Sequence, residues 1–207
     1  MTNERTVIVV DDDDAVRDSL KILLESADFI TIAYDSGHSF LKGHQRGSVA
    51  CLLLDVRLPD MNGLDLQQAL KNENIDLPVI VMTGYADVSL AVRAMKAGAV
   101  DFIEKPIDRV SLLASINDAF DFARAPRDAR IASSDHSAKI ELLTPREKDV
   151  LEQLVIGRPN KVIAYELGIS PRTVEIHRAR VMKKMAARGL SHLVRMALES
   201  GIDPGDI

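Results

Sequence analysis

An abrupt change from apolar to acidic residues near the start of the chain most limits what it can fold into. Four apolar, mostly β-branched residues at positions 7–10 are typical of a short buried strand. Four aspartates follow at once, at positions 11–14, and unpaired buried carboxylates are too costly to extend that strand into a core. The strand must therefore end at a sheet edge that faces solvent. The aspartates either begin a solvated helix, which the helix dipole favours, or gather around a cation.

The length and composition suit a protein with one or two packed domains. Of its 207 residues, 46% are hydrophobic and 28% are charged. No apolar run approaches the roughly 20 residues of a membrane-spanning helix, and the first residues do not resemble a signal peptide. We therefore expect a cytoplasmic protein with no membrane partner. The single cysteine, Cys51, excludes an internal disulfide, and its apolar neighbours predict a buried structural thiol.

Charge is distributed unevenly along the chain. Residues 1–124 contain 20 acidic and 12 basic residues, a net charge of −8, whereas residues 141–207 have a net charge of +2. Within residues 158–195 the excess rises to nine basic against two acidic residues. This asymmetry predicts two domains with different partners, and the basic half is the candidate for binding a polyanion.

The acidic half alternates between strand-like and helix-like segments. Short apolar runs, typical of strands buried on both faces, cover residues 6–10, 29–33, 50–54, 78–82 and 99–103. Helical spacing is clear around residues 14–26, 64–70, 88–95 and 108–124. Such alternation predicts an α/β fold with a five-stranded, parallel, doubly wound sheet. Ligands of such sheets bind outside the carboxyl ends of the strands.

Chemically active side chains follow four of the five predicted strands. Asp11 and Asp12 follow the first strand, Asp55 the third, Thr83 the fourth and Lys105 the fifth. Any one aspartate could simply cap a helix, but their joint placement at matching strand ends favours a binding site. Mg²⁺ takes oxygen ligands, typically one or two carboxylates with water. We expect Asp12 and Asp55 to bind Mg²⁺ directly and Asp11 to bind it through water.

The chemistry that suits such a site is phosphoryl transfer to Asp55. This central carboxylate can attack phosphorus and give an acyl phosphate. The metal and Lys105 would neutralise charge on the phosphoryl oxygens, and Thr83 would donate a hydrogen bond to one of them. Gly84 leaves space beside the phosphoryl group.

Two backbone features are predicted close to these residues. Gly63 is expected in a tight turn, where it supplies a backbone conformation that other residues resist. The Lys105–Pro106 peptide bond is a candidate for the cis form, because only bonds that precede proline adopt it at low cost.

The set Asp11-Asp12, Asp55, Thr83, Phe102 and Lys105-Pro106 resembles the receiver domain of two-component response regulators. The resemblance covers residues 1–123 and implies the sheet order 2-1-3-4-5. It also implies that Asp55 takes its phosphoryl group from a sensor histidine kinase, with the backbone carbonyl of Arg57 as a further metal ligand. Thr83 and Phe102 would form the switch that responds. Phe102 could instead pack as an ordinary core aromatic, and both interpretations stay open.

The second half is helical in pattern. Residues 124–139 dilute the apolar pattern and predict a linker whose start can be helical. Thr144-Pro145-Arg146-Glu147 is a capping box that begins a helix, and Asn160 is expected to cap a second helix that ends at Gly168. A third helix begins after Ser170 and a fourth at about residue 191. The second and third helices have the signature of a helix-turn-helix.

The third helix of this half, up to Met185, separates into two faces. Val174, Val181 and Met185 have the spacing of a buried stripe. A charged outer face is usually only solvated, but on the second helix of a helix-turn-helix we expect it to enter the major groove of DNA. The predicted DNA contacts are Lys161, Arg172, Thr173, Glu175, Ile176, His177, Arg178, Ala179, Arg180 and Lys183.

These contacts differ in what they can recognise. Arginine and lysine suit phosphates or guanine, while Ile176 and Ala179 suit thymine methyl groups. Glu175 could accept a hydrogen bond from cytosine or hold a neighbouring arginine. His177 could contact the DNA backbone or serve as a half-buried packing residue.

The run LTPREKDVLEQLVIGRPNKVIAYELGISPRTVEIHRARVMKKM resembles the LuxR-type DNA-binding domain of the NarL/FixJ family, and we assign residues 140–207 to it. GYADVSLAVRAMKAGAVDFIEKP and HLVRMAL are similar to its nitrogen-fixation members. The resemblance implies a regulator phosphorylated on Asp55 that forms a homodimer and binds promoter DNA. It also implies RNA polymerase as a partner and activation of nitrogen-fixation or respiration genes, rather than turnover of external substrates.

Two rival functions remain at the level of sequence. A metal-dependent phosphatase would use the same acidic site, but it needs a second acid or base beside Asp55. The residue two positions later, where such phosphatases typically carry an aspartate, is Arg57, which cannot serve as one. The other rival is a scaffold that binds DNA without phosphorylation.

Overall fold

The structure, a computed structural model, describes residues 5–44, 50–84, 88–124 and 135–202. These residues fall into two compact units. The first is built on a β-sheet flanked by helices. The second is helical, and α4 (Val88–Lys96) is grouped with it.

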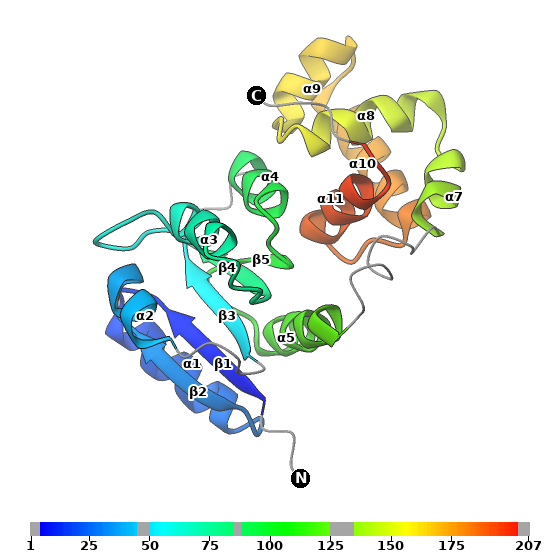
Figure 1. Cartoon of the computed structure of the whole chain (residues 1–207). Coiled ribbons are helices and arrows are strands. Elements are labelled where there is room, and N and C mark those ends of the chain that lie inside the picture. The colour runs from blue at the N-terminus through cyan, green and yellow to red at the C-terminus, as the bar shows by residue number, and fades with distance from the viewer. Residues whose placement is uncertain (1–4, 45–49, 85–87, 125–134, 203–207) are drawn as a thin grey trace. The chain divides into compact units, whose positions relative to one another are not determined.

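The sheet has five parallel strands in the order β2-β1-β3-β4-β5 (Figure 1). The strands are β1 (Thr6–Val10), β2 (Ile30–Tyr34), β3 (Ala50–Asp55), β4 (Val79–Thr83) and β5 (Asp101–Glu104). Both the number of strands and their order agree with the sequence-based prediction. Because β1 and β3 are neighbours and β4 and β5 continue from them, the carboxyl ends of four strands lie along one edge.

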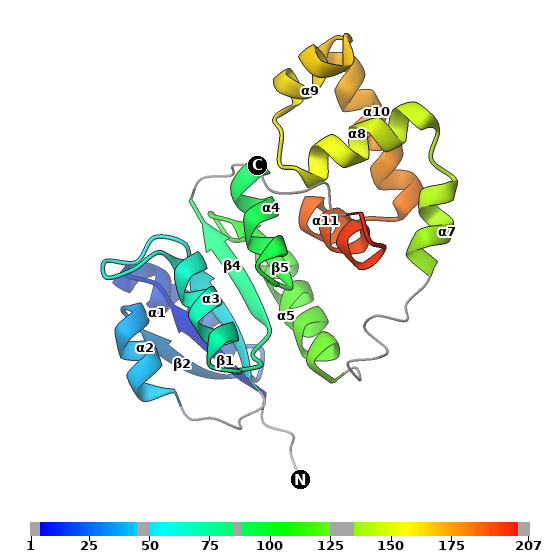
Figure 2. The same ribbon diagram turned by 45° about the horizontal axis from the view of Figure 1, so that its top comes forward.

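The helices of the first unit lie on both faces of the sheet (Figure 2). They are α1 (Asp14–Glu25), α2 (Gly37–Gly43), α3 (Gly63–Asn72) and α5 (Arg109–Arg124). The sequence pattern did not single out α2. Its seven residues include few apolar side chains, so it has no clear helical stripe; the Ser36 side chain caps it by accepting a hydrogen bond from the Ser39 amide.

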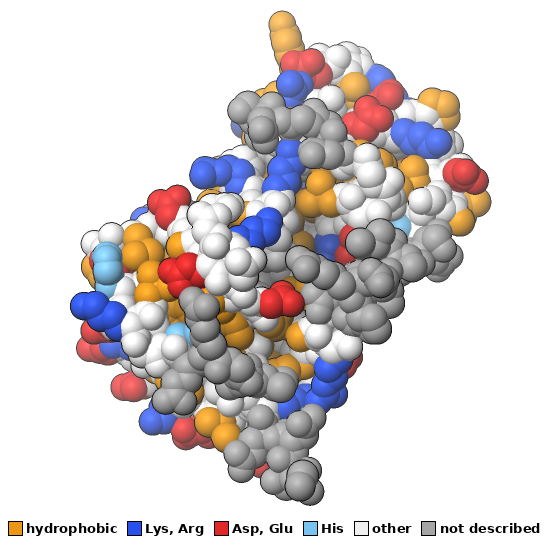
Figure 3. Space-filling view, viewed as in Figure 1, with side chains coloured by type: hydrophobic (Ala, Val, Ile, Leu, Met, Phe, Trp, Pro, Cys, Tyr) orange, Lys and Arg blue, Asp and Glu red, His pale blue; other side chains and the backbone are white. Residues whose placement is uncertain are grey.

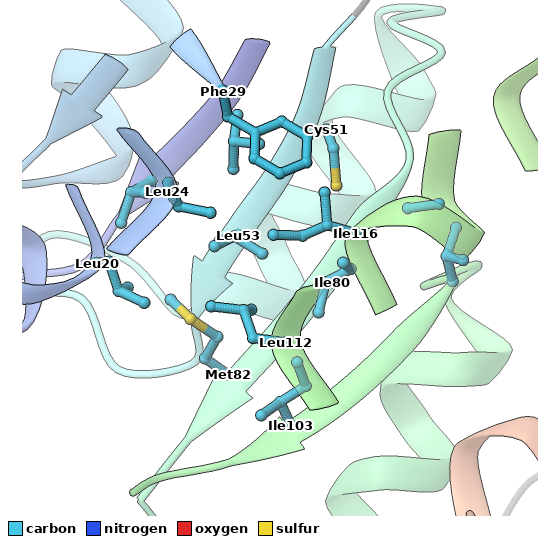
Figure 4. Close-up of a cluster of buried hydrophobic side chains, with 14 of the residues drawn as sticks. Leu20, Leu24, Phe29, Cys51, Leu53, Ile80, Met82, Ile103, Leu112 and Ile116 are labelled. Atoms are coloured by element: carbon cyan, nitrogen blue, oxygen red, sulfur yellow. The ribbon is translucent and has the colours of Figure 1, made fainter. Parts of the chain in front are cut away.

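One hydrophobic cluster fixes the sheet against α1 and α5 (Figure 4). Alternate strand residues point into it, because successive side chains of a strand face opposite sides. The labelled members come from both helices, from the sheet and, for Phe29, from the position just before β2: Leu20, Leu24, Phe29, Cys51, Leu53, Ile80, Met82, Ile103, Leu112 and Ile116. Cys51 is fully buried there, as the sequence predicted. The packing holds the ends of β1, β3, β4 and β5 in a fixed relation.

Within residues 135–202, the second unit contains five helices in addition to α4. They are α7 (Asp135–Glu141), α8 (Pro145–Val155), α9 (Asn160–Leu167), α10 (Pro171–Met185) and α11 (Leu190–Glu199). Their buried residues form a core within the unit, to which Leu151, Val174 and Leu193 contribute. None of the helices in the described ranges is long and apolar enough to span a membrane.

Most of the predicted helix ends agree with the structure, but one cap does not. Thr144 and Glu147 form the expected capping box, and Gly168 ends α9 with a φ of 64°. Asn160 was expected to cap α9, yet it is the first residue of the helix and its cap position is taken by Pro159 without a side-chain hydrogen bond. The fixed φ of proline suits that extended position, so the helix starts without a side-chain cap.

The predicted linker is described only in part. Arg124 is the last residue of α5, and residues 125–134 lie outside the described residues. The end of the predicted linker is helical, because α7 begins at residue 135. The sequence of α7 is mostly polar and shows no apolar stripe, so the sequence pattern does not predict this helix.

Candidate functional site

Two carboxylates and an ammonium group meet at the carboxyl edge of the sheet. The Nζ atom of Lys105 lies 2.6 Å from Oδ2 of Asp11 and 2.8 Å from Oδ1 of Asp55. Asp11 follows β1, Asp55 ends β3 and Lys105 follows β5, so the strand order brings together residues 94 positions apart in the chain. Asp11 has 0% of its surface exposed and Asp55 has 5%. The backbone amide of Lys105 donates to the carbonyl oxygen of Thr83 at 2.7 Å, which ties β5 to the end of β4.

Backbone groups hold both carboxylates in place. The Arg57 amide donates to Oδ2 of Asp55 at 2.8 Å, and the Asp13 amide donates to Oδ1 of Asp11 at 3.1 Å. Arg17, on α1, donates to the carbonyl oxygen of Asp11 at 2.6 Å and also binds the Asp14 carboxylate. Each oxygen of Asp55 therefore has one donor, the Lys105 ammonium on one side and a main-chain amide on the other.

Of the four consecutive aspartates, the last two lie at the start of a helix, as the sequence predicted. Asp13 is the N-cap of α1 and accepts hydrogen bonds from the amides of Ala15 and Val16. Asp14 begins the same helix and is exposed. Asp11 alone is buried, and Asp12 is exposed beside it at the sheet edge.

Burial and pairing act against each other on the charges of this site. Burial raises the pKa of Asp11 above its usual value, and the contact with Lys105 only partly opposes that effect. For Lys105, burial alone would lower the pKa, but hydrogen bonds to Asp11 and Asp55 outweigh it and raise the pKa above the usual value. The ammonium group therefore stays charged at neutral pH and stabilises the neighbouring carboxylates.

Gly63 is required for a different reason from the one predicted. Its backbone does not adopt the left-handed conformation that favours glycine. A Cβ atom at this position would instead lie 2.2 Å from the backbone oxygen of Asp55, so the close approach of α3 to β3 excludes a side chain. The Lys105–Pro106 bond is cis, as predicted.

The remaining predicted residues of the sheet edge differ in their exposure. Thr83 is buried at the end of β4, whereas Gly84 is exposed and has open space around it. The side chain of Arg57 is exposed while its amide faces Asp55. Phe102 is half-buried and is not part of the cluster in Figure 4. A switching role for Thr83 and Phe102 stays a prediction.

The oxygen donors of this edge suit a hard cation. In the part of the chain that the structure describes, no three His, Cys, Asp or Glu side chains are grouped closely enough to hold a metal as they stand. Mg²⁺ does not need three, because it keeps several waters and binds one or two carboxylates. The exposed Asp12 and the buried Asp55 supply such carboxylates, and the donor set fits Mg²⁺ in its chemistry.

The second unit presents the predicted DNA-contact residues largely on its surface. Val174, Val181 and Met185 of α10 are buried, as predicted. The exposed members of the predicted set are Lys161, Arg172, Glu175, Ile176, Ala179, Arg180 and Lys183, and the half-buried members are Thr173, His177 and Arg178. Figure 3 shows Lys and Arg side chains among polar and hydrophobic ones on the visible face of this unit.

Several side chains of the helical unit were missed by the sequence analysis. Arg146 donates to the carbonyl oxygen of Leu167 and so ties α8 to the end of α9. Lys184 lies 2.7 Å from the buried Glu147 carboxylate and joins α10 to the start of α8. Tyr165, on α9, is 88% exposed. Tyr165 follows the buried pair Ile163 and Ala164 and falls outside the apolar stripe of α9, and this spacing could have predicted its exposure from the sequence.

Comparison with known proteins agrees with this architecture. Residues 7–117 match the family model described as response regulator receiver domain, and residues 141–197 match the one described as bacterial regulatory proteins, luxR family. The chain is a response regulator of the FixJ/LuxR type. It is a response regulator transcription factor, since the receiver is followed by the helix-turn-helix domain.

Relatives of this response regulator match it over nearly its full length. The transcriptional regulatory protein FixJ of Bradyrhizobium diazoefficiens is 44% identical over 202 residues, which are 98% of each chain. FixJ of Azorhizobium caulinodans is 46% identical over 206 residues, covering 100% of this chain and 98% of the relative. The crystal structure of full-length FixJ from B. japonicum is 43% identical, with a TM-score of 0.55, and the match covers 96% of this chain and 98% of that one.

Proposed function

We propose that this response regulator accepts a phosphoryl group on Asp55 from a sensor histidine kinase and binds promoter DNA in response. The observation that carries the proposal is the pairing of Asp55 with both Lys105 and the Arg57 amide at the sheet edge. A carboxylate held between two donors is fixed in orientation, and positioning is a major part of catalysis in phosphoryl transfer.

The transfer forms one bond to phosphorus and breaks another. An oxygen of Asp55 forms a bond to the phosphorus of the kinase phosphohistidine, and the phosphorus–nitrogen bond breaks. The electron pair leaves with the imidazole nitrogen, which takes up a proton. The Lys105 ammonium, already within hydrogen-bond distance of Asp55, neutralises charge on the phosphoryl oxygens. Thr83, at the end of β4, is the proposed hydrogen-bond donor to one of those oxygens, and the open space at Gly84 accommodates the group.

Mg²⁺ is the proposed cofactor. Asp12, Asp55 and the backbone carbonyl of Arg57 would hold it, with Asp11 acting through water. When bound, the cation supplies positive charge to the phosphoryl oxygens. In the structure as described, Lys105 binds both Asp11 and Asp55, so part of the charge compensation at this edge is already present.

Phosphorylation is proposed to act through a switch and a dimer. Thr83 would move toward the phosphoryl group and Phe102, now half-buried, would turn inward. The face that would change includes α4 and β5, and receivers of two chains would pair there. Phosphorylation can shift this equilibrium only as far as it favours the active conformation. The pairing would bring two helix-turn-helix domains to paired half-sites.

DNA contact is proposed for the exposed face of α10. Arg172, Arg180 and Lys183 would bind phosphates or guanine, and Ile176 is exposed where it could meet a thymine methyl group. Half-burial of His177 supports the packing alternative, because its Nδ1 atom is buried without a hydrogen-bond partner among the described residues. RNA polymerase is the proposed further partner. Nitrogen-fixation or respiration genes are the proposed targets, and the relatives named transcriptional regulatory protein FixJ support a role in transcription.

Dimerisation and DNA binding, measured with and without a small phosphodonor and Mg²⁺, test the proposal. We expect the phosphodonor to label wild type once per chain, shift it to a dimer and raise its DNA affinity. Asp55→Asn should show none of these changes, whereas Asp65→Asn, at an exposed position in α3, should behave as wild type. Label retained in Asp55→Asn, or sustained turnover of varied phosphate esters, would contradict the proposal. A DNA affinity that is the same with and without the phosphodonor would favour a constitutive DNA-binding scaffold.

A further inference from the structure

The loop between β3 and α3, residues 56–62, is tethered to the start of α2 by the carboxylate of one of its residues. Asp60 accepts hydrogen bonds from the backbone amides of Gly37, at 3.1 Å, and His38, at 2.7 Å. Nδ1 of His38 lies 2.5 Å from the same carboxylate. These contacts join segments 22 or 23 positions apart in the chain. One carboxylate therefore connects two parts of the first unit that the sheet does not join directly.

Packing reinforces the tether beside Asp60. A Cβ atom at Gly37 would lie 2.6 Å from Sδ of Met61, so the Met61 side chain rests directly on the backbone of α2. The far end of the loop is closed as well. Arg57 and Asn62 form an antiparallel bridge, and the Gly63 amide donates to the carbonyl oxygen of Val56 at 2.8 Å. Contacts between its own two ends therefore close the base of the loop, and contacts with α2 hold its tip.

Capping of α2 does not by itself explain these contacts. Ser36 already caps the helix through its bond to the Ser39 amide. Asp60 binds two further amides of the first turn from a distant segment, so it adds a connection between segments to a helix that has its own cap. Partial burial opposes the charge of Asp60, but the bonds from His38 and Gly37 outweigh it and lower the pKa to about 2. The tether is therefore an ionised carboxylate at any physiological pH.

The loop carries two groups that the proposed function uses. Its second residue, Arg57, donates its amide to Asp55 and supplies the proposed carbonyl ligand for Mg²⁺. A displacement of the loop would move both groups together, because they belong to the same residue.

We propose that Asp60 is a positioning residue, which holds the Arg57 backbone in the geometry that orients Asp55 and receives Mg²⁺. The inference rests on the proposed function of Asp55. Asp60 touches neither the phosphoryl group nor the metal; it acts through the loop. Outer contacts of this kind orient the groups that bind a metal, and their loss typically lowers metal affinity about 10-fold or more.

The test measures Mg²⁺ binding to the full-length protein by calorimetry, with the metal alone and no phosphodonor. We expect Asp60→Ala to weaken Mg²⁺ binding about 10-fold and to shift the Arg57 amide resonance in NMR spectra recorded without metal. Asp65→Ala is the matched control: it removes the same charge from an exposed position five residues later and should leave both readouts near wild type. The resonance shift separates displacement of the loop from loss of charge.

The outcomes distinguish this inference from the proposed function. If wild type binds Mg²⁺ through Asp55 and Asp60→Ala binds it equally well with an unmoved Arg57 resonance, the positioning role is wrong and the proposed function stands. If Mg²⁺ binding does not depend on Asp55, the proposed metal site is wrong, and the positioning role of Asp60 is then wrong as well. Should Asp60→Ala not fold, Asp60→Asn keeps one acceptor oxygen, and an affinity equal to wild type in that variant would also overturn the role.

Discussion

The backbone oxygen of Asp55 occupies the space that a side chain at Gly63 would need, since an added Cβ would lie 2.2 Å from it. A distance this short cannot be relieved by rotating a side chain, because the obstacle is main chain. Gly63→Ala should therefore displace the start of α3 or the end of β3. We expect the first unit to lose about 1–3 kcal/mol of unfolding free energy, the usual cost of overpacking. Urea unfolding of the full chain measures the loss.

A matched glycine shows whether the position matters. No heavy atom lies within 4 Å of a Cβ built on Gly84, so Gly84→Ala should stay within about 0.5 kcal/mol of wild type. Equal stability of the two variants would show that α3 does not pack as closely on Asp55 as described.

The single cysteine offers a probe of the same unit. Cys51, the second residue of β3, has 0% of its surface exposed, and burial raises the pKa of its thiol. A thiolate is the reactive form, so native protein should react with a thiol reagent far more slowly than urea-unfolded protein. Gly63→Ala should react faster than wild type in moderate urea. Rapid labelling of native wild type would contradict the buried position.

The sequence was informative where burial and chemistry act on neighbouring residues. Apolar runs that end in Asp11, Asp55 or Thr83 revealed both the strands and the shared edge, because a buried strand cannot continue through such groups. Parallel pairing then required these residues to lie together. The cluster of Asp11, Asp55 and Lys105 follows from that topology alone.

What the sequence did not reveal depends on contacts between distant segments. α2 is too short for an apolar stripe, and the role of Asp60 appears only once the loop after β3 meets Gly37. Gly63 looked like a turn residue because its contact with Asp55 is not visible in the local sequence. Asn160 is a common residue type at a helix cap, but α9 begins one position earlier in the chain than predicted, with Pro159 at the cap.

The helical unit has a carboxylate whose titration should set its acid stability. The contact with Lys184 and the hydrogen bond from the Thr144 amide lower the pKa of Glu147 from 4.5 to about 2. A lowered folded-state pKa stabilises the protein above the unfolded value, and that stability is lost as pH falls from about 4.5 to 2. Glu147→Gln should remove on the order of 3 kcal/mol at neutral pH and flatten the loss in acid. Hydrogen exchange of the Val150 and Leu151 amides measures this.

Glu152 provides the comparison, because it is exposed on the same helix. Glu152→Gln should keep the acid dependence of the wild type and its stability within about 0.5 kcal/mol. If Glu147→Gln and wild type lose stability in parallel below pH 4.5, Lys184 and Thr144 do not hold the carboxylate as the structure indicates.

Salt dependence of DNA binding should separate residues that touch phosphates from those that are only solvated. Arg180 and Lys183 are exposed on α10, so Arg180→Ala and Lys183→Ala should each weaken binding by the phosphorylated protein and lower the slope of log affinity against log salt by about 1. Lys148→Ala removes the same charge from the half-exposed side of α8 and should leave the slope unchanged. Fluorescence anisotropy with a labelled promoter duplex at several salt concentrations supplies the slopes. Equal slopes for all three variants would place the DNA away from α10.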